Sequence, residues 1–171
     1  MAPVVVLIGP PGSGKSSVGA RLARVLGTEL RDTDADVEAT EGRSVADIFV
    51  SDGEEYFRQL ERVAVATAIA EHTGVLSLGG GAPIDEETQA VLTKYVADGG
   101  VVVFLDITLT AAVPRVGLNA TRPLLLGNPR QKWLALMNDR RPVYERLATM
   151  TVLTDNRRPS HIAAEIAQAV S

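Results

Sequence analysis

The 171-residue chain has no cysteine, and this absence excludes disulfide bonds, zinc–thiolate sites and cysteine nucleophiles. Histidine is almost absent as well, with only His72 and His161, which lie far apart in the sequence. We interpret both as helix-surface residues, so a catalytic centre built on histidine is not expected. Any catalytic function must therefore use other residue types.

The chain also lacks a strong charge of one sign and any long apolar run. Its net charge of −4 argues against a broad basic surface for nucleic acid. No segment reaches the length of a membrane span, and the first apolar run stops at Gly9, which favours a strand over a signal peptide. With 46% apolar and 22% charged residues, the composition predicts a single globular domain, residues 1–171, located in the cytoplasm.

The most informative motif is a phosphate-binding loop. Residues Gly9 to Ser16 (G-P-P-G-S-G-K-S) fit the pattern G-x-x-x-x-G-K-[ST], and they lie between the strand-like run Val4–Ile8 and a helical pattern. Lys15 is placed to reach the β- and γ-phosphates, and Ser16 to offer its hydroxyl to Mg²⁺. The loop predicts a nucleoside triphosphate site, but motors, switches, transporters and small-molecule kinases all use such a loop.

The rest of the chain alternates between strand-like and helical patterns. The further strand-like runs are Glu29–Asp32, Val75–Leu78, Val101–Leu105 and Met150–Leu153. The expected helices are one that ends at Gly27, a short one capped by Ser44, Glu54–His72, Asp85–Val96, Thr110–Val116, Arg130–Arg140, and one capped by Ser160 that ends near Val170. Apolar strands alternating with helices predict a parallel sheet covered on both faces.

One segment differs from this pattern. Residues 116–129 contain two glycines, two prolines and the single arginine Arg122. In a phosphoryl-transfer enzyme such a segment is a candidate mobile lid, which we place at about 117–128.

Polar clusters follow three of the predicted strands. The phosphate loop follows the first, Asp32-Thr33-Asp34 the second and Gly79-Gly80-Gly81 the third. Ligands bind at the carboxyl ends of parallel strands, so these clusters predict metal-assisted phosphoryl transfer to a small acceptor.

Each polar residue also has a simpler interpretation. Asp32 and Asp34 could form a turn and a helix cap. Arg58 has Glu54 and Glu61 at helical spacing, which is enough for a solvated ion pair. Arg140 has Asp139 and Glu145 nearby and could lie on the surface, and Trp133 is best read as a packing residue.

Taken together, the motifs resemble the shikimate kinase family along nearly the whole chain. The matching segments are Gly9–Ser16, Asp32–Asp34, Glu41–Phe49, Gly53–Glu61, Leu78–Gly81, Thr121–Leu125 and Arg140–Tyr144. The resemblance implies a three-layer α/β/α P-loop kinase fold of the nucleoside monophosphate kinase type. The fold has a five-stranded parallel sheet in the order 2-3-1-4-5, a substrate-binding region at about 33–61 and a lid. The implied reaction is transfer of the γ-phosphoryl of ATP, with Mg²⁺, to the 3-hydroxyl of shikimate in aromatic amino acid biosynthesis.

The resemblance also implies roles at the acceptor. Asp34 would hold the shikimate hydroxyls and accept the 3-hydroxyl proton. Arg58 and Arg140 would bind the carboxylate, with Glu61 orienting Arg58. The glycine turn, Gly79, Gly80 and Gly81, would bind the substrate, with Gly80 and Gly81 offering backbone N–H groups.

On the nucleotide side, the resemblance assigns phosphate binding to Gly12, Ser13, Gly14, Lys15, Ser16 and Ser17. Ser16 and Asp32 would serve the Mg²⁺ ion, Asp32 through water. Lys15 and Arg122 would neutralise the transferring phosphate. Arg115 and Arg158 would lie about the adenine, although Arg157 competes with Arg158 for that place.

Two other functions remain open from the sequence. Gluconate and nucleoside monophosphate kinases share the phosphate loop but not the set Asp34, Arg58, Gly80 and Arg140. A nucleotide-dependent switch without turnover would leave Asp34 without a role. Nothing in the sequence demands more than a monomer that binds shikimate and ATP, with no nucleic acid and no membrane.

Overall fold

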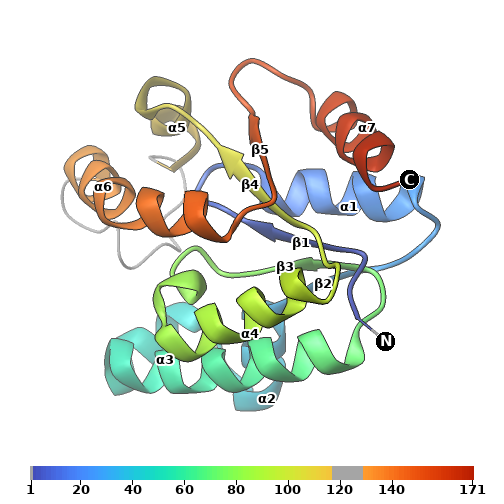
Figure 1. Cartoon of the computed structure of the whole chain (residues 1–171). Helices are drawn as coiled ribbons and strands as arrows, with labels where there is room; N and C mark the ends of the chain where they lie inside the picture. Colours follow the sequence, from blue (N-terminus) through green and yellow to red (C-terminus); the bar gives the residue numbers. More distant parts are fainter. Residues whose placement is uncertain (1, 117–128) are drawn as a thin grey trace.

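A computed structural model describes residues 2–116 and 129–171 of the chain. It shows three layers, in which a central sheet lies between two layers of helices (Figure 1). The strands are β1 (Val5–Ile8), β2 (Leu30–Asp32), β3 (Val75–Ser77), β4 (Val102–Asp106) and β5 (Met150–Leu153). They are all parallel, in the order β2-β3-β1-β4-β5. The predicted fold class and strand order are therefore confirmed.

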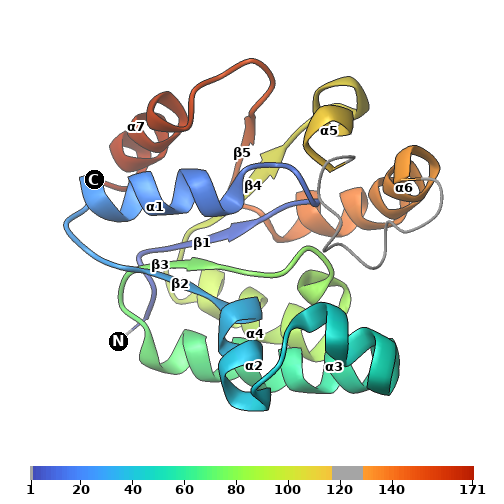
Figure 2. The same ribbon diagram turned by 180° about the vertical axis from the view of Figure 1, so that it is seen from behind.

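Alternate residues of the central strands are buried on opposite faces of the sheet, as the geometry of a strand requires. Val5 and Leu7 pack under α1 (Lys15–Val25) and α7 (Pro159–Val170). Val6 and Ile8 face the opposite layer, which contains α3 (Val45–Glu71), α4 (Glu86–Ala97), α5 (Leu109–Val116) and α6 (Pro129–Leu147). Figure 2 shows α1 and α7 side by side on their face of the sheet. Burial on both faces explains why the central strands β1, β3 and β4 are largely apolar, whereas the edge strands β2 and β5 are less buried and carry polar residues.

The helices differ from the prediction in several places. The short helix after Ser44 and the longer helix from Glu54 form one element, α3, which is kinked at Gly53 (φ 86°, ψ 172°). Helix α6 continues beyond Arg140 to Leu147, and a helix that was not predicted, α2 (Thr33–Glu41), follows β2 directly. Ser44 does cap α3, because its hydroxyl accepts the N–H of Asp47 at 3.1 Å.

The predicted cap at Ser160 is wrong. The N-cap of α7 is Arg158, and Pro159 is the first helical residue. Proline is preorganised for that position, so Ser160 lies inside the first turn. His161 is exposed on α7, as predicted, whereas His72 is half-buried at the end of α3. Its Nε2 lies 3.1 Å from the carbonyl oxygen of Glu29 and 3.0 Å from that of Val75.

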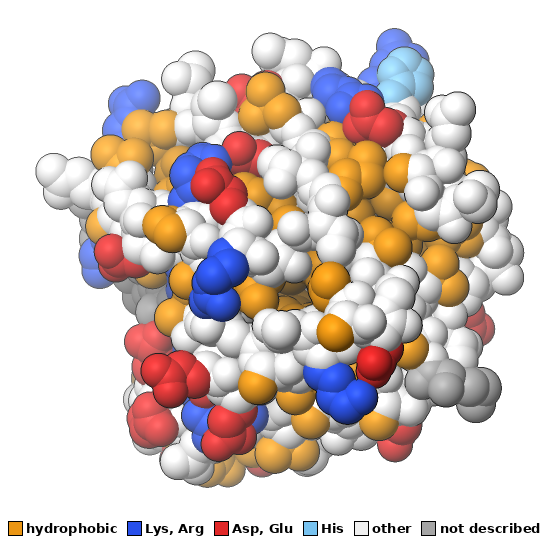
Figure 3. All heavy atoms as spheres, in the orientation of Figure 1, with side chains coloured by type: hydrophobic (Ala, Val, Ile, Leu, Met, Phe, Trp, Pro, Cys, Tyr) orange, Lys and Arg blue, Asp and Glu red, His pale blue; other side chains and the backbone are white. Residues whose placement is uncertain are grey.

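The surface carries both signs of charge. On the face shown in Figure 3, lysines and arginines are interspersed with aspartates and glutamates, and acidic side chains gather near the kinked end of α3. Within residues 2–116 and 129–171, no helix combines the length and the apolarity needed to cross a membrane.

Candidate functional site

A cleft of about 630 Å³ opens at the carboxyl ends of the strands. At one end it is lined by the phosphate loop, at the other by α3, the glycine turn (Gly79–Gly81) and α6. The predicted site residues that line it are Gly12, Gly14, Lys15, Ser16, Ser17, Asp32, Asp34, Arg58, Glu61, Gly79, Gly80, Gly81, Arg115 and Arg140. These residues come from six separate stretches of the chain and meet in one place.

The phosphate loop has the backbone conformation that its glycines permit. Gly12 and Gly14 have φ values of 84° and 93°, in the left-handed region that favours glycine. Gly14 is the N-cap of α1, so the positive end of that helix faces the loop. The Nζ of Lys15 donates to the carbonyl oxygens of Gly9 at 2.7 Å and Pro10 at 3.1 Å. The lysine therefore lies across its own loop, where an anion bound by the loop would contact it.

Side chains from distant helices hold the loop in place. Arg115 of α5 donates to the carbonyl oxygen of Gly12 at 2.8 Å. Trp133 of α6 is 2% exposed, and its Nε1 donates to the carbonyl oxygen of Pro11 at 2.9 Å. Trp133 is thus a packing residue, as predicted, but it also fixes the phosphate loop, which sequence reasoning missed.

Asp32 and Ser16 lie at the phosphate end of the cleft. Asp32 ends β2 and caps α2, because its Oδ1 accepts the N–H of Asp34 at 2.8 Å. The helix-cap interpretation of Asp32 is therefore correct, and Asp32 also lines the cleft. Ser16 is exposed in the first turn of α1.

Two carboxylates face the same point beside Gly79. Asp34 Oδ1 and Glu61 Oε2 are shielded from solvent and have no hydrogen-bond partner among the described residues. A methyl group on Gly79 would lie 2.7 Å from Asp34 Oδ1 and 2.8 Å from Glu61 Oε2. Burial, and next the charge of Asp32, raises the pKa of Asp34 to about 6. Burial also raises the pKa of Glu61 to about 7. Unpartnered buried oxygens in a cleft mark a place for a hydrogen-bond donor from a ligand.

Arg58 lies above the glycine turn. Its Nη1 pairs with Glu61 at 2.7 Å, and its Nη2 with Glu54 at 3.3 Å, so the predicted ion pairs exist. The pairing with Glu61 is not a solvated one, since the Glu61 side chain is only 3% exposed. The backbone of Gly81 passes so close to the guanidinium that a methyl group there would lie 2.7 Å from Cζ of Arg58. The ion pairs therefore orient Arg58 in the cleft.

Arg140 is not a surface residue, and that interpretation is wrong. It is 5% exposed and makes no ion pair with any of the described acidic side chains. It lies on the inner face of α6, and its Nη1 would be 3.2 Å from a methyl group on Gly80. The arginine is turned inward because its helix buries Trp133, Met137 and Tyr144 along the same face. A buried guanidinium without a carboxylate partner in the described protein is suited to an anionic ligand.

The remaining predicted residues lie elsewhere. Ser13 is buried in the loop, and its Oγ has no hydrogen-bond partner among the described residues. Arg158 is exposed and does not line the cleft, while Arg157 pairs with Glu165 of α7 at 3.1 Å. Arg122 and the predicted lid, 117–128, lie outside the described residues.

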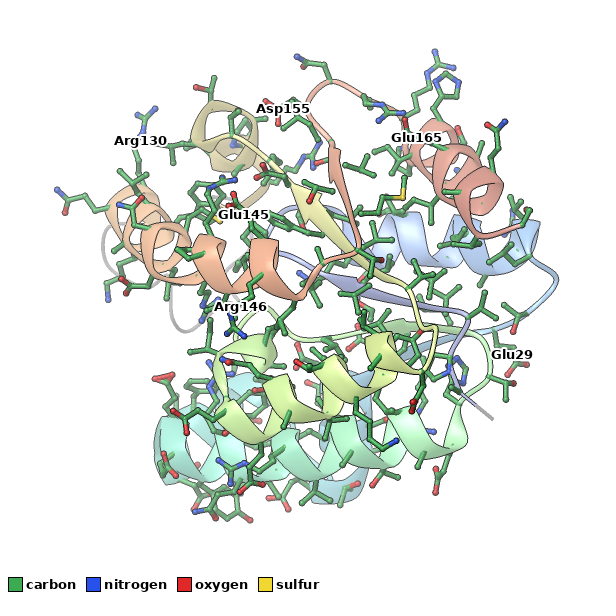
Figure 4. The ribbon with its side chains drawn as sticks, in the orientation of Figure 1. Glu29, Arg130, Glu145, Arg146, Asp155 and Glu165 are labelled. Atoms are coloured by element: carbon green, nitrogen blue, oxygen red, sulfur yellow. The ribbon has the colours of Figure 1, made fainter. Side chains whose placement is uncertain are left out.

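A second hollow, smaller than the cleft, lies beside Arg115. It is lined by residues from α5, the loop before it and the loop after β5, including Thr108 and Asp155. The carboxylate of Asp155 accepts the N–H of Thr108 at 3.0 Å and its hydroxyl at 2.5 Å. Figure 4 shows Asp155 in the loop after β5, next to α5. This hollow adjoins the phosphate end of the site through Arg115, which lines both.

Sequence reasoning also missed two aromatic contributions to the site. Phe49 and Phe57 line the cleft and contact each other, with their ring centroids 4.9 Å apart. The hydroxyl of Tyr144 donates to the carbonyl oxygen of Gly80 at 2.6 Å. A signal for Tyr144 existed, because residues 133, 137, 140 and 144 have the spacing of one helix face.

Comparisons with known proteins lead to the same family as the sequence motifs. The model of the family described as shikimate kinase matches residues 11–171. A shikimate kinase of Salinispora arenicola is 54% identical over 98% of this chain and 97% of its own length, and one of Streptomyces coelicolor is 52% identical over 99% and 96%. A solved structure of shikimate kinase from Acinetobacter baumannii in complex with shikimate has a TM-score of 0.92 and 32% identity, covering 99% of this chain and 93% of that chain. The fold, the cleft and these matches agree that the chain belongs to the shikimate kinase family.

Proposed function

We propose that this chain transfers the γ-phosphoryl group of ATP to the 3-hydroxyl of shikimate, giving shikimate 3-phosphate and ADP in aromatic amino acid biosynthesis. The observation that carries this proposal is the approach of two arginines, Arg58 and Arg140, to one glycine turn in a cleft that begins at a phosphate loop. Planar guanidinium groups bind carboxylates well, and shikimate is a carboxylate that carries hydroxyls. We place this reaction in the cytoplasm, where ATP is available, and in a monomer.

At the acceptor end, each residue has a role that its position allows. Arg58, held by Glu61, and Arg140 would bind the carboxylate, while Gly80 and Gly81 would offer N–H groups. Asp34 would orient the hydroxyls and accept the proton of the 3-hydroxyl, because its shielded Oδ1 needs a donor from the ligand.

At the donor end, the backbone from Gly12 to Ser17 would surround the phosphates, and Lys15 would neutralise charge on the transferring group. Arg115 would lie between the phosphates and the adenine, since it contacts Gly12 and lines both hollows. The roles of Arg122 beside the phosphate and of Arg158 beside the adenine rest on the family resemblance alone.

The residues at the phosphate end fit a magnesium ion bound together with ATP. Magnesium typically takes one or two protein oxygens and completes its shell with phosphates and water. Ser16 and Asp32 supply a hydroxyl and a carboxylate in the cleft lining, and the described residues contain no larger cluster of metal-ligating side chains. Ser16 would bind the ion directly and Asp32 through water. The ion would neutralise charge on the phosphates.

The proposal is tested by measuring ADP release with shikimate, gluconate and nucleoside monophosphates, each with Mg²⁺ and then with the metal chelated. We expect turnover with shikimate alone, lost on chelation. Gluconate is the demanding competitor because it also carries a carboxylate and hydroxyls. Turnover that prefers gluconate, or ADP release independent of any acceptor, contradicts the proposal.

A further inference from the structure

Helix α6 places one polar aromatic group against the glycine turn. Tyr144 is fully buried, and its ring packs on Phe104 with a centroid distance of 5.0 Å. Its hydroxyl reaches out of this apolar contact and donates to the carbonyl oxygen of Gly80 at 2.6 Å. Burial raises the pKa of Tyr144 to about 12, so the hydroxyl remains a donor at any working pH.

This hydrogen bond sets the direction of an N–H group in the cleft. The peptide between Gly80 and Gly81 is trans, so its C=O and its N–H point in opposite directions. With the C=O held by Tyr144, the N–H of Gly81 points away from α6. That N–H finds no acceptor among the described residues, and Gly81 lines the cleft. The position of Tyr144 therefore determines the direction of the Gly81 N–H in the cleft.

Arg140 lies one turn before Tyr144 on α6, and its positive charge opposes the rise in the pKa of the Tyr144 hydroxyl. Arg140 in turn is packed against Gly80, as is Pro11 of the phosphate loop, whose Cδ would be 3.4 Å from a methyl group on Gly80. Tyr144 and the buried Arg140 thus both meet Gly80 from the same face of α6. Among the described residues the buried hydroxyl of Thr33 also contacts the turn, but it accepts the N–H of Gly79 at 3.3 Å and so holds a different peptide.

We propose that Tyr144 is a positioning residue of the acceptor site: its hydroxyl fixes the Gly80–Gly81 peptide and Arg140 in the arrangement that binds the substrate carboxylate. The inference rests on the proposed function for the identity of that substrate. Tyr144 lies behind the turn and would act through Gly81 and Arg140, since it does not line the cleft.

The experiment compares Tyr144→Phe with a matched control, Tyr95→Phe. Tyr95 is also buried (5% exposed), and its hydroxyl lies 2.7 Å from the carbonyl oxygen of Pro3 and 3.4 Å from that of Val101, so both changes remove a buried hydroxyl donor to a backbone carbonyl. Tyr95 does not line the cleft. Steady-state kinetics with shikimate and ATP, and urea unfolding of both variants, separate a positioning effect from a loss of stability.

We expect Tyr144→Phe to raise the KM for shikimate roughly tenfold while the KM for ATP stays within about twofold, because a buried carbonyl loses its donor only at the acceptor end. Tyr95→Phe should leave both KM values within about twofold. In ¹⁵N-labelled protein without ligand, the amide resonance of Gly81 should move in Tyr144→Phe and stay in Tyr95→Phe.

Equal KM changes for the two substrates, the same changes in both variants, or an unmoved Gly81 resonance would overturn the inference. The resonance needs no substrate, so it tests the positioning role even if the proposed function fails. That failure would be recognised separately, since wild-type protein would then show no turnover with shikimate.

Discussion

The phosphate loop and the acceptor end of the cleft (Asp34, Arg58, Glu61, the glycine turn and Arg140) both depend on glycine, but for different physical reasons. In the loop, Gly12 and Gly14 have φ values near +90°, and a methyl group on Gly14 would meet nothing closer than 3.9 Å. In the glycine turn no residue has a positive φ, yet a methyl group on Gly79 would collide with two carboxylates. At Gly12 and Gly14 the loop needs conformational freedom, whereas at Gly79 the turn needs space. Only the need for conformational freedom can be recognised from a local sequence pattern.

The two ends also differ in solvent exposure. Ser16 is exposed and Lys15 half-buried, whereas Glu61 is 2% exposed and Arg140 is 5% exposed. Charges at the acceptor end are therefore removed from water before any ligand arrives, and the raised pKa of Glu61 reflects that cost. The phosphate end binds with backbone groups from one segment, and the acceptor end binds with preorganised side chains from several helices.

The largest expected effect comes from Asp34→Asn, which should act on the acceptor end alone. Loss of the proton acceptor should lower turnover on the order of 10²–10⁴-fold, because general-base catalysis contributes about that much. ATP affinity should be unchanged. The measurement is kcat for shikimate together with titration of nucleotide.

Asp36→Asn is the matched control for Asp34→Asn. Asp36 lies on the same helix and pairs with Arg31 at 2.7 Å, away from the cleft. Turnover of Asp34→Asn near that of the control would show that Asp34 is neither base nor essential orienter.

Next in size are Arg58→Ala and Arg140→Ala. Removing one charged partner of a carboxylate costs about 1.5–3 kcal/mol, so shikimate affinity should fall roughly 10- to 150-fold while ATP affinity is nearly intact. Calorimetric titration of each variant with both ligands measures this. The controls are Arg62→Ala and Arg141→Ala, neighbours on the same helices that pair with Asp85 and Asp106 instead. Unchanged shikimate affinity would show that Arg58 and Arg140 do not bind the substrate carboxylate.

The contrast between the two ends also explains what the sequence could predict. The phosphate loop is a contiguous motif, and apolar strands alternating with helices sufficed for the sheet and its parallel direction. The burial of Arg140 could not be read in the same way, since Asp139 and Glu145 beside it suggested a surface ion pair. Its true environment depends on which face of α6 packs inward, and that is a property of the tertiary structure. Only the family resemblance placed it in the site.

A smaller effect concerns stability. The pKa of Glu61 is raised from 4.5 to about 7 in the folded protein, so the folded state binds the extra proton between these values. The stabilisation of the folded state by protonated Glu61 is complete below pH 4.5 and is lost as the pH rises through about 7. Glu61→Gln removes the titration. Relative to wild type, the variant should gain roughly 2–3 kcal/mol of unfolding free energy between pH 4.5 and pH 8.

Urea unfolding at several pH values measures that change. Glu54→Gln is the control, because Glu54 pairs with the same arginine from a side chain that is 51% exposed. An identical pH trend in both variants would show that burial of Glu61 does not set the trend. The buried carboxylate of Glu61 would then destabilise the folded state no more than an exposed carboxylate does.

The smallest expected effect tests the two uses of glycine directly, with Gly14→Ala and Gly79→Ala. An alanine at φ 93° costs about 1–2 kcal/mol in backbone strain, so Gly14→Ala should raise the KM for ATP several-fold. Gly79→Ala adds a methyl group 2.7 Å from Asp34 Oδ1, and movement of that side chain should instead raise the KM for shikimate by a similar factor. Because the same methyl group is added at each position, only the location differs. If both variants changed the same KM, the two ends would not be independent structures, and the glycines of the turn would serve the phosphate loop as well.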